Sequence, residues 1–407
     1  MRTSMWGAAL LAALTALGCA PEEQQTTGGT SVVAGPFGRG VVVAGTDYQA
    51  SNLSLLGVDG KVLSAVFAST STTGMSWDVA LPSMPVAGED VVYLDRTFSL
   101  VTWLDVKTAK LRAQLHADGD DLGKNPWDYL PISPEKAYVT RYDRSPGKSL
   151  HGDVIVVNPK TATVTSPIER RIDVAAALSL PEGDYSVHPA RGVVIGDRAY
   201  VTTVIATLDY AYTDSQVVEI DTTKDEVVAV TPLDGLHDCT GIAASPSGAE
   251  LAVSCSGDLT ANGDPALGTA GVALLKREGL SLNKVYPATA LGAGVPGFAL
   301  SYAGERSLVV TLLGNVKDSV DDVAIALDLD SGATKEIHRA GPVQIGAVLC
   351  PAREGGAPDT SPEACFVTDA DSYATLRFPV NQGVLGDPIS TEVDDGRGHP
   401  PRYIGQF

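Results

Sequence analysis

Short apolar runs separated by turn residues recur along the chain at intervals of roughly 50 residues. The clearest run is a strand-like phrase of small, β-branched and aromatic residues, such as Ala-Tyr-Val-Thr. Its seven copies lie at residues 40–44, 91–94, 137–140, 199–202, 251–254, 308–311 and 365–368. Each copy is followed by a second apolar run that ends in Asp, Asn, Gly, Pro or Lys, the residue types typical of hairpin turns. These second runs lie at residues 53–60, 101–107, 154–160, 217–223, 272–279, 323–330 and 374–381.

Two further short strands complete the repeat. One precedes the phrase, for example at residues 127–135, 240–248 and 298–304, and another returns after the second run, as at residues 162–165 and 226–230. A four-stranded unit repeated around a ring is the sequence pattern of a β-propeller. We therefore predict an all-β, seven-bladed β-propeller of four-stranded antiparallel blades.

The two ends of the repeat region complement each other. Residues 400–407 have the pattern of an innermost strand without the rest of its blade, and residues 40–44 that of a second strand without a first. Pairing them completes blade 1 and removes two exposed sheet edges. We therefore predict that the ring is closed by C-terminal strand pairing with the N-terminal strands.

Blades 3 and 4 carry a resemblance to a known family. Residues 137–142 (Ala-Tyr-Val-Thr-Arg-Tyr) and 153–164 resemble one repeat of the YVTN-family β-propellers, and residues 199–230 resemble the next. The likeness extends over about residues 36–407. It implies a seven-bladed propeller related to the quinoprotein amine dehydrogenase-like and WD40-like group. It implies no single activity, because such propellers are used for many functions.

The N-terminus has the layout of an export signal. Arg2 precedes an apolar run at residues 5–17, and Gly18 and Cys19 follow it. This order is typical of a secretory signal, and the run is too short to span a bilayer as a helix. Residues 16–19 (Ala-Leu-Gly-Cys) resemble a bacterial lipoprotein box, with the usual order of the Leu and Ala exchanged. The resemblance implies that Cys19 is lipidated and becomes the first residue of the mature chain.

These features divide the chain into three parts. Residues 1–18 are predicted to be a lipoprotein signal peptide, residues 19–35 a polar, flexible tether, and residues 36–407 the β-propeller domain. Ala20 replaces the aspartate that signals inner-membrane retention in enteric bacteria. We therefore expect an exported protein of the cell envelope, a lipoprotein of the outer membrane of a Gram-negative bacterium.

Composition limits the partners. The chain has 407 residues and a formal net charge of −20 at pH 7. A surface that acidic repels phosphate backbones, so we expect no nucleic acid partner. The expected partners are a membrane, reached through the lipid anchor, and a protein or small-molecule ligand that the sequence does not identify.

The cysteines predict two disulfides. With Cys19 lipidated, four cysteines remain, and export permits them to pair in one of three ways. Cys239 and Cys255 flank one predicted hairpin turn symmetrically, and Cys350 and Cys365 flank another. Residues equidistant from a hairpin turn face each other across the strands. We therefore predict a disulfide within blade 5 and another within blade 7.

Alternation of strand direction predicts which loops share a face. The loops between blades and the loops after each Tyr-Val-Thr strand lie together, and they are long and rich in polar and aromatic residues. Packing between blades or capping of loop amides could equally explain these residues. The ligand-binding candidates on this face are Trp77, Asp78, Trp127, Asp128, Tyr185, His237, Asp238 and His399.

No linear motif of a known enzyme class is present. The histidines show no metal-motif spacing, and no cofactor can be identified. Asp258, Asn262 and Asp264 have the spacing of calcium ligands without the full pattern, so a divalent cation such as calcium is a minor alternative to turn chemistry. The first hypothesis is a ligand- or protein-binding scaffold at the cell envelope. The alternatives are a subunit of an envelope assembly and a propeller enzyme, either a lactonase-like hydrolase or a quinoprotein-type dehydrogenase, with its site at the central channel.

Overall fold

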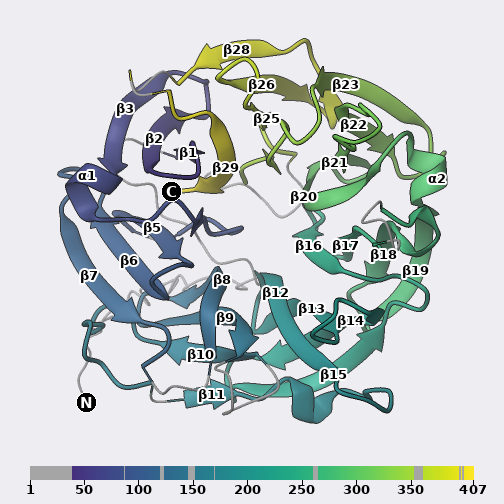
Figure 1. Cartoon of the computed structure of the whole chain (residues 1–407), viewed down its shortest axis with the longest axis horizontal. Coiled ribbons are helices and arrows are strands. Elements are labelled where there is room, and N and C mark those ends of the chain that lie inside the picture. Colours follow the sequence, from purple (N-terminus) through teal and green to yellow (C-terminus); the bar gives the residue numbers. More distant parts are fainter. Residues whose placement is uncertain are drawn as a thin grey trace, which may run out of the picture.

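The chain folds into a ring of seven antiparallel sheets around a central axis (Figure 1). The computed structural model describes residues 39–86, 88–119, 123–144, 152–168, 170–259, 265–352, 361–393, 396 and 398–407. The predicted all-β, seven-bladed propeller is therefore confirmed. The predicted signal peptide and the whole predicted tether, Cys19 included, lie outside the described residues, so those boundaries stay predictions.

Within each blade the strands follow one another from the axis outwards. Blade 1 contains β29 (Pro401–Gln406), β1 (Gly40–Thr46), β2 (Ser51–Gly57) and β3 (Val62–Ser69). Blade 2 contains β4 (Val79–Ala80), β5 (Asp90–Asp95), β6 (Leu100–Asp105) and β7 (Leu111–His116). Blade 3 contains β8 (Gly123–Ser133), β9 (Lys136–Arg144), β10 (Asp153–Val157) and β11 (Arg170–Ile172). Blade 4 contains β12 (Ser186–Ile195), β13 (Arg198–Ala206), β14 (Tyr212–Asp221) and β15 (Glu226–Pro232).

The last three blades follow the same order. Blade 5 contains β16 (Cys239–Ala244), β17 (Glu250–Cys255), β18 (Gly271–Lys276) and β19 (Ser281–Pro287). Blade 6 contains β20 (Val295–Gly304), β21 (Ser307–Leu313), β22 (Asp322–Asp328) and β23 (Thr334–Ala340). Blade 7 contains β24 (Val348–Leu349), β25 (Ala364–Asp369), β26 (Ala374–Asn381), β27 (Val384–Leu385) and β28 (Ile389–Glu392).

Helical turns occur only in connections within the described part of the chain. They are α1 (Thr70–Thr73), η1 (Ala175–Ala177), η2 (Leu267–Thr269) and α2 (Ala288–Leu291). Among the residues described, no helix has the length and apolar character needed to cross a membrane.

The recurring phrase forms the second strand of every blade, and its threonine has a structural role. Thr140 is fully buried and accepts a hydrogen bond from the backbone N–H of Asp128 at 2.9 Å. Thr202, also buried, donates its hydroxyl to the carbonyl of Arg191 at 3.1 Å, and Thr368 accepts from the N–H of Ala347 at 2.9 Å. These bonds satisfy backbone groups of the innermost strand, for which a buried partner is required. The threonine therefore connects the second strand to the edge that surrounds the axis.

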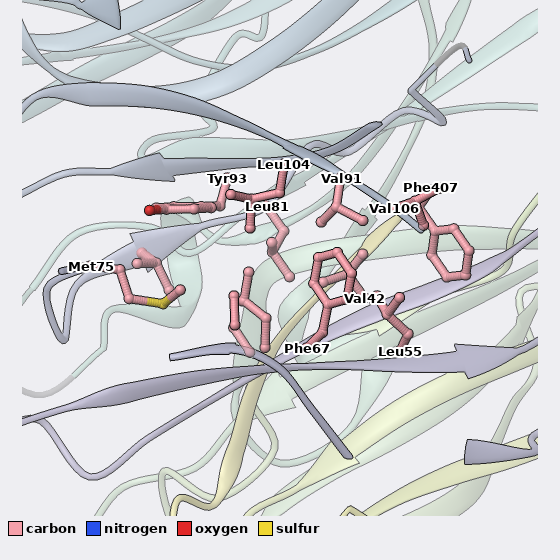
Figure 2. Packing of buried hydrophobic residues seen from close by; sticks show 14 residues of the cluster. Val42, Leu55, Phe67, Met75, Leu81, Val91, Tyr93, Leu104, Val106 and Phe407 are labelled. Atoms are coloured by element: carbon pink, nitrogen blue, oxygen red, sulfur yellow. The ribbon is translucent and has the colours of Figure 1, made fainter. Parts of the chain in front are cut away.

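The predicted ring closure is confirmed in blade 1. Strand β29 pairs antiparallel with β1, with Val41 opposite Gln406 and Val43 opposite Ile404. Phe407 is buried in a cluster contributed by blades 1 and 2, together with Val42, Leu55 and Val91 among others (Figure 2). The end of the chain therefore seals the contact between the first two blades.

Both predicted disulfides are present. Cys239 is bonded to Cys255, and the two residues lie opposite each other in the β16–β17 register. Cys350 is bonded to Cys365, one position beyond the paired Leu349 and Phe366. Each disulfide joins the first two strands of one blade, as the hairpin positions predict.

Removing the blade 5 disulfide should destabilise the protein without changing its fold. Cys239 and Cys255 are separated by 16 residues, so the loop-entropy model gives a loss of roughly 3 kcal/mol for the double substitution to alanine. Urea denaturation measures the free energy of unfolding. Dithiothreitol reduces both disulfides of the wild type, so the wild type should lose about 6 kcal/mol, and the double variant about half of that, because the variant keeps only the blade 7 disulfide. Equal losses in both proteins would contradict the prediction.

Two outer strands differ from the sequence prediction. Residues 162–165 were expected to form a strand, but the outer strand of blade 3 is β11 (Arg170–Ile172). The hydroxyls of Thr163 and Ser166 lie 3.0 Å apart, and the N–H of Thr163 donates to Ser166 Oγ, so local side-chain bonds favour a turn there. In blade 7, β27 and β28 pair with opposite ends of β26 and together replace one continuous outer strand.

Candidate functional site

The loops between blades and the loops between second and third strands lie on one face, here called the inter-blade face. The opposite face carries the turns within blades and is called the hairpin face. The sequence candidates fall into separate groups on or below the inter-blade face. Asp78 and Trp127 belong to one group near the axis, and His237 and Asp238 belong to another over blades 4 and 5.

A stack of cationic and aromatic side chains runs across blades 2, 3 and 4. The guanidinium carbon of Arg96 lies 4.5 Å from the ring centroid of Trp127, and that ring stacks on Tyr142 with centroids 4.4 Å apart. Tyr142 in turn lies against His188, at 4.7 Å between centroids. Arg96 is fixed by Asp78, which accepts from its Nε at 2.8 Å. Arg96, Trp127, Tyr142 and His188 are called the aromatic stack below.

Asp128, next to Trp127 in sequence, has a different place. It is fully buried, and its carboxylate accepts from the Ser83 hydroxyl at 2.6 Å and from the N–H groups of Ser83 and Gly192, each at 3.0 Å. Burial raises the pKa of Asp128, while the charge of Arg191 and the bonds from Ser83 oppose that rise. The carboxylate therefore already accepts hydrogen bonds from the protein, and we interpret Asp128 as a residue that supports the site rather than one that contacts a ligand.

The segment after β4 crosses from blade 2 towards blade 4. Its Ser83 also donates to the carbonyl of Gly192 at 2.9 Å, and the sulfur of Met84 accepts from the N–H of Val194 at 2.9 Å. Blades 2, 3 and 4 are therefore joined near the axis by Ser83, Asp128 and Gly192. Sequence patterns do not show this crossing, because it depends on contacts between residues more than 40 positions apart.

Arg191 is the charged group that these contacts leave without a partner. It lies on β12 of blade 4, at an irregularity in the strand pairing between Pro189 and Gly192. Its side chain is half-buried, its buried Nε has no hydrogen-bond partner, and no ion pair joins its guanidinium to a carboxylate of the described residues. Burial lowers the pKa of Arg191, and the charges that act on it come from Asp128, Arg96 and Tyr403. Strand β12 is the innermost strand of blade 4, so Arg191 lies on the strand that borders the axis.

A second group lies where blades 3, 4 and 5 meet. Both ring nitrogens of His237 contact carboxylates: Nδ1 lies 2.7 Å from a carboxylate oxygen of Asp258, and Nε2 lies 3.3 Å from one of Asp214. Asp238 has a left-handed backbone conformation, with φ of 48°, which is uncommon for a residue other than glycine. Burial, together with the charge of Asp258, raises the pKa of Asp238 to about 6.

The remaining candidates do not join either group. Trp77 is exposed and makes an edge contact with Tyr48, with ring centroids 6.1 Å apart. His399 is buried close to Gly45. The pKa of Asp47 is lowered mainly by two backbone hydrogen bonds to its carboxylate, and less by the charge of His399. Tyr185 packs at the edge of the core between blades 3 and 4. Whether any of the eight candidates contacts a ligand stays a prediction.

The described residues contain no set of three or more His, Cys, Asp or Glu side chains placed to hold a metal ion. Of the three residues with calcium-like spacing, Asn262 and Asp264 lie outside that part of the chain. Asp258 is described, and it pairs with His237. A cation site in this loop therefore stays an untested prediction.

A cleft of about 850 Å³ lies away from both groups, between blades 6 and 7. Its lining includes Arg306, Asp328, Lys335 and Asn381. Asp328, Lys335 and Asn381 belong to β22, β23 and β26, and Arg306 lies in the turn between β20 and β21. None of the sequence candidates lines this cleft.

Sequence reasoning missed Arg96 and Arg191. A signal for Arg191 existed, because a charged residue between Ala190 and Gly192 interrupts an otherwise apolar inner strand. A lone charge within a predicted buried strand indicates either a buried pair or a site. Arg96 gave no comparable signal, since a charged residue directly after a strand is ordinary turn composition.

Comparison with known proteins bears on the fold. No protein family and no curated protein matches the sequence. Among solved structures, a periplasmic gluconolactonase of Pseudomonas aeruginosa is 17% identical, with 90% of this chain and 98% of that chain covered and a TM-score of 0.56. The chain resembles lactonase-type propellers in fold.

Two further structures give the same result. A putative 6-phosphogluconolactonase of Bacteroides fragilis is 12% identical, with a TM-score of 0.54 and coverage of 91% of this chain and 98% of that chain. Another, of Bacteroides uniformis, is 11% identical, with a TM-score of 0.52 and coverage of 91% and 99%. At these identities the likeness establishes the seven-bladed architecture and leaves the activity open.

Proposed function

We propose that this chain is an exported binding protein of the cell envelope that takes a small anionic ligand beside Arg191, on the axial side of the inter-blade face. The observation that carries the proposal is the half-buried guanidinium of Arg191 without a counter-ion among the described residues. A carboxylate or phosphate group is the ligand chemistry that a guanidinium binds best, through two parallel hydrogen bonds.

The surroundings of Arg191 support binding of an anion. A buried donor without a partner costs about 1–3 kcal/mol, and more when it is charged. The nearest carboxylate, Asp128, already accepts bonds from Ser83 and Gly192, so it adds charge but no direct bond. Arg96 lies near enough to Arg191 to affect its pKa and adds a second positive charge. The exposed part of the aromatic stack offers ring faces for the apolar part of a ligand.

The net charge of −20 affects the rate at which such a ligand associates with the protein. The overall field repels an anion at long range, whereas Arg191 attracts it at contact. Added salt screens the long-range repulsion. We therefore expect moderate salt to leave the association rate unchanged or to raise it, unlike binding at a surface that is basic throughout.

Titration calorimetry with gluconate, 6-phosphogluconate and inorganic phosphate tests the proposal. We expect at least one of these probes to bind, and the variant Arg191→Gln to bind it at least about tenfold more weakly, since a charge-assisted hydrogen bond contributes about 1.5–3 kcal/mol. Arg191→Lys should retain part of the affinity, because it keeps the charge and loses the planar fork.

Arg339→Gln is the matched control, because Arg339 is an exposed arginine on β23 that pairs with Glu336 and lies in a different blade. Its affinity should equal that of the wild type. Arg191→Gln should remain as stable as the wild type, since it removes an unpaired charge. Failure of all three anions to bind, or equal binding by the wild type and Arg191→Gln, would refute the proposal.

A lactonase-like hydrolase is the second candidate, and Asp238 is the observation that favours it. A carboxyl group with a pKa of about 6 can exchange a proton near neutral pH. The fold neighbours are named gluconolactonase and 6-phosphogluconolactonase. Proton release from glucono-1,5-lactone measures the activity. Acceleration over the spontaneous rate that is lost in Asp238→Asn would favour the enzyme, and no acceleration favours the binding protein. The quinoprotein-type dehydrogenase remains a prediction from the sequence resemblance.

The proposed location is outside the cytoplasm, with the chain anchored to the outer membrane through a lipid on Cys19. The two disulfides support an oxidising compartment. The gluconolactonase neighbour of Pseudomonas aeruginosa is named as periplasmic. Mass spectrometry of the mature protein should show an N-terminal Cys19 carrying acyl chains. An unmodified Cys19, or cleavage at another bond, would contradict the anchor.

A further inference from the structure

Three exposed aromatic side chains lie in neighbouring loops of the inter-blade face, over blades 1 and 2. Tyr48 belongs to the β1–β2 loop and is 50% exposed, and Phe98 belongs to the β5–β6 loop and is 52% exposed. Trp77, in the connection between the two blades, is 42% exposed. Single exposed apolar side chains are ordinary, whereas several together mark an interaction surface. Tyr48, Trp77 and Phe98 are called the Trp77 patch below.

Direct contacts join the first two members of the Trp77 patch. The rings of Tyr48 and Trp77 meet edge to face, with centroids 6.1 Å apart and an angle of 66° between the ring planes. The hydroxyl of Thr46, which is fully buried, accepts from the N–H of Tyr48 at 3.0 Å and lies 3.1 Å from the carbonyl oxygen of Trp77. One buried side chain therefore positions the backbone of both aromatic residues.

Asp95 connects the loop of the third member to the other two. Asp95 is 1% exposed, and its carboxylate accepts from the N–H of Ser76 at 2.7 Å and from the N–H of Phe98 at 2.9 Å. Ser76 directly precedes Trp77, so the loops that carry Trp77 and Phe98 lie side by side. The patch is therefore held in place before a ligand binds, which reduces the conformational entropy lost on binding.

A guanidinium lies at one edge of the Trp77 patch. The guanidinium carbon of Arg402, on β29, lies 5.5 Å from the ring centroid of Tyr48, and its Nη1 donates to the carbonyl of Val343. Val343 belongs to the connection between blades 6 and 7. A guanidinium carries five N–H donors. The surface therefore combines exposed aromatic rings with a hydrogen-bond donor whose position is fixed.

We propose that the Trp77 patch binds a neutral saccharide chain. The face of an aromatic ring carries partial negative charge, which attracts the C–H groups of a sugar ring, and removal of both apolar surfaces from water adds to binding. Hydroxyl groups of the sugar accept hydrogen bonds from Arg402. This inference does not rest on the anion site at Arg191, which belongs to blade 4.

The charges of the molecule favour a neutral partner. The net charge of −20 repels an anionic membrane surface, and it repels a second copy of this chain equally. A basic partner is attracted at long range, but the positive charge of Arg402 opposes a cationic group at the patch itself. A neutral saccharide meets neither form of repulsion.

Titration calorimetry with three uncharged hexasaccharides, cellohexaose, N-acetylchitohexaose and maltohexaose, tests the proposal. We expect at least one of them to bind the mature chain, and Trp77→Ala to bind it at least about tenfold more weakly, because a central aromatic residue carries much of the binding energy. Trp77→Phe should retain part of the affinity, since it keeps a ring face. Tyr210→Ala is the matched control, because Tyr210 is a 70% exposed aromatic residue on the same face in blade 4; its affinity should equal that of the wild type.

Salt and tryptophan fluorescence provide two further readouts. Added salt should leave the affinity nearly unchanged, because binding of a neutral ligand forms no ion pair that salt would screen. The saccharide should also protect the fluorescence of the mature chain from acrylamide quenching. Trp103 is fully buried, so quenching reports on Trp77 and on the half-buried Trp127. Trp77→Phe should show none of this protection.

The outcomes separate this inference from anion binding. Arg191→Gln should bind the saccharide as the wild type does. No binding of any hexasaccharide at millimolar concentration, or equal binding by the wild type and Trp77→Ala, overturns the proposal and leaves the Arg191 site unaffected. If no saccharide binds, binding to phosphatidylcholine vesicles or self-association that is lost in Trp77→Ala would assign the patch to a membrane or to a second copy, and would also overturn it.

Stability measurements show that the test does not depend on misfolding. Trp77→Ala should unfold at nearly the same urea concentration as the wild type, because a side chain that is 42% exposed contributes little to the stability of the fold. Loss of saccharide binding in a variant with the wild-type unfolding midpoint then reports on the surface alone.

Discussion

A chain that lacks residues 401–407 should fail to form the closed propeller. The deletion removes β29, so β1 loses its inner partner and blade 1 presents an unpaired strand to the axis. It also removes Phe407 and Ile404, which are 2% and 4% exposed. Loss of a buried phenylalanine costs about 3–5 kcal/mol and loss of a buried isoleucine about 2–5 kcal/mol. The sum approaches the whole stability of a typical domain, about 5–15 kcal/mol.

Circular dichroism and size-exclusion chromatography would follow this deletion. We expect loss of the cooperative unfolding transition and a larger hydrodynamic radius. Phe407→Ala should destabilise the intact chain by about 3–5 kcal/mol. Phe298→Ala is its control, because Phe298 is 46% exposed and its loss should cost less than about 1 kcal/mol. A deleted chain with the wild-type unfolding midpoint would show that ring closure does not stabilise the fold.

Asp153→Ala should be the most destabilising single substitution of a charged residue in blade 3. Asp153 binds Arg141 through two bonds of 2.6 Å, and the two side chains are 2% and 0% exposed. Arg141 also donates to the carbonyl of Ala117 at 2.6 Å. Without Asp153, the charge of Arg141 stays buried with its main counter-ion gone. Breaking such a pair by removing one partner costs about 3–5 kcal/mol.

A double substitution separates the cost of losing the ion pair from the cost of leaving one charge buried without its partner. Arg141→Met with Asp153→Leu should recover most of the stability, because replacing a buried ion pair with apolar side chains is often neutral. Glu336→Ala is the matched control, since its pair with Arg339 is about half exposed and should contribute no more than about 1 kcal/mol. Urea denaturation gives the free energies. A loss below about 1 kcal/mol for Asp153→Ala would show that Arg141 finds another partner.

The architecture could be predicted because it depends on local patterns that repeat. Each copy of the phrase is a buried strand whose turn residues follow at nearly the same distance, so seven copies predicted seven blades. The disulfides followed from the hairpins in the same way, since Cys239 and Cys255 are equidistant from a turn. The outer strand of blade 3 was placed wrongly at residues 162–165, where hydrogen bonds between Thr163 and Ser166 form a turn instead.

The sequence could predict only the face of the propeller on which the candidate site lies. Asp78, Trp127, His237 and Asp238 lie in the two groups described, but the order of loops could not show which of them meet. Their contacts join residues from different blades: Arg96 of blade 2 with Trp127 of blade 3, and His237 with Asp214 of blade 4 and Asp258 of blade 5. Those contacts depend on how the blades are arranged in space. Arg191 became a candidate only from the structure, which shows that the carboxylate of Asp128 already accepts hydrogen bonds from Ser83 and Gly192.

The place where the chain enters the ring sets the point at which the predicted tether joins the propeller. Arg39 donates to the carbonyl of Val86 at 3.0 Å, and β1 begins beside Phe407 on the hairpin face. If Cys19 carries a lipid as proposed, the anchored segment would therefore join the ring at the hairpin face, opposite the inter-blade loop that carries Asp238. With the anchor on that side, the inter-blade loops would be free to face the aqueous compartment. Ligands would then reach them from solution, and a partner could dock over them without contact with the bilayer.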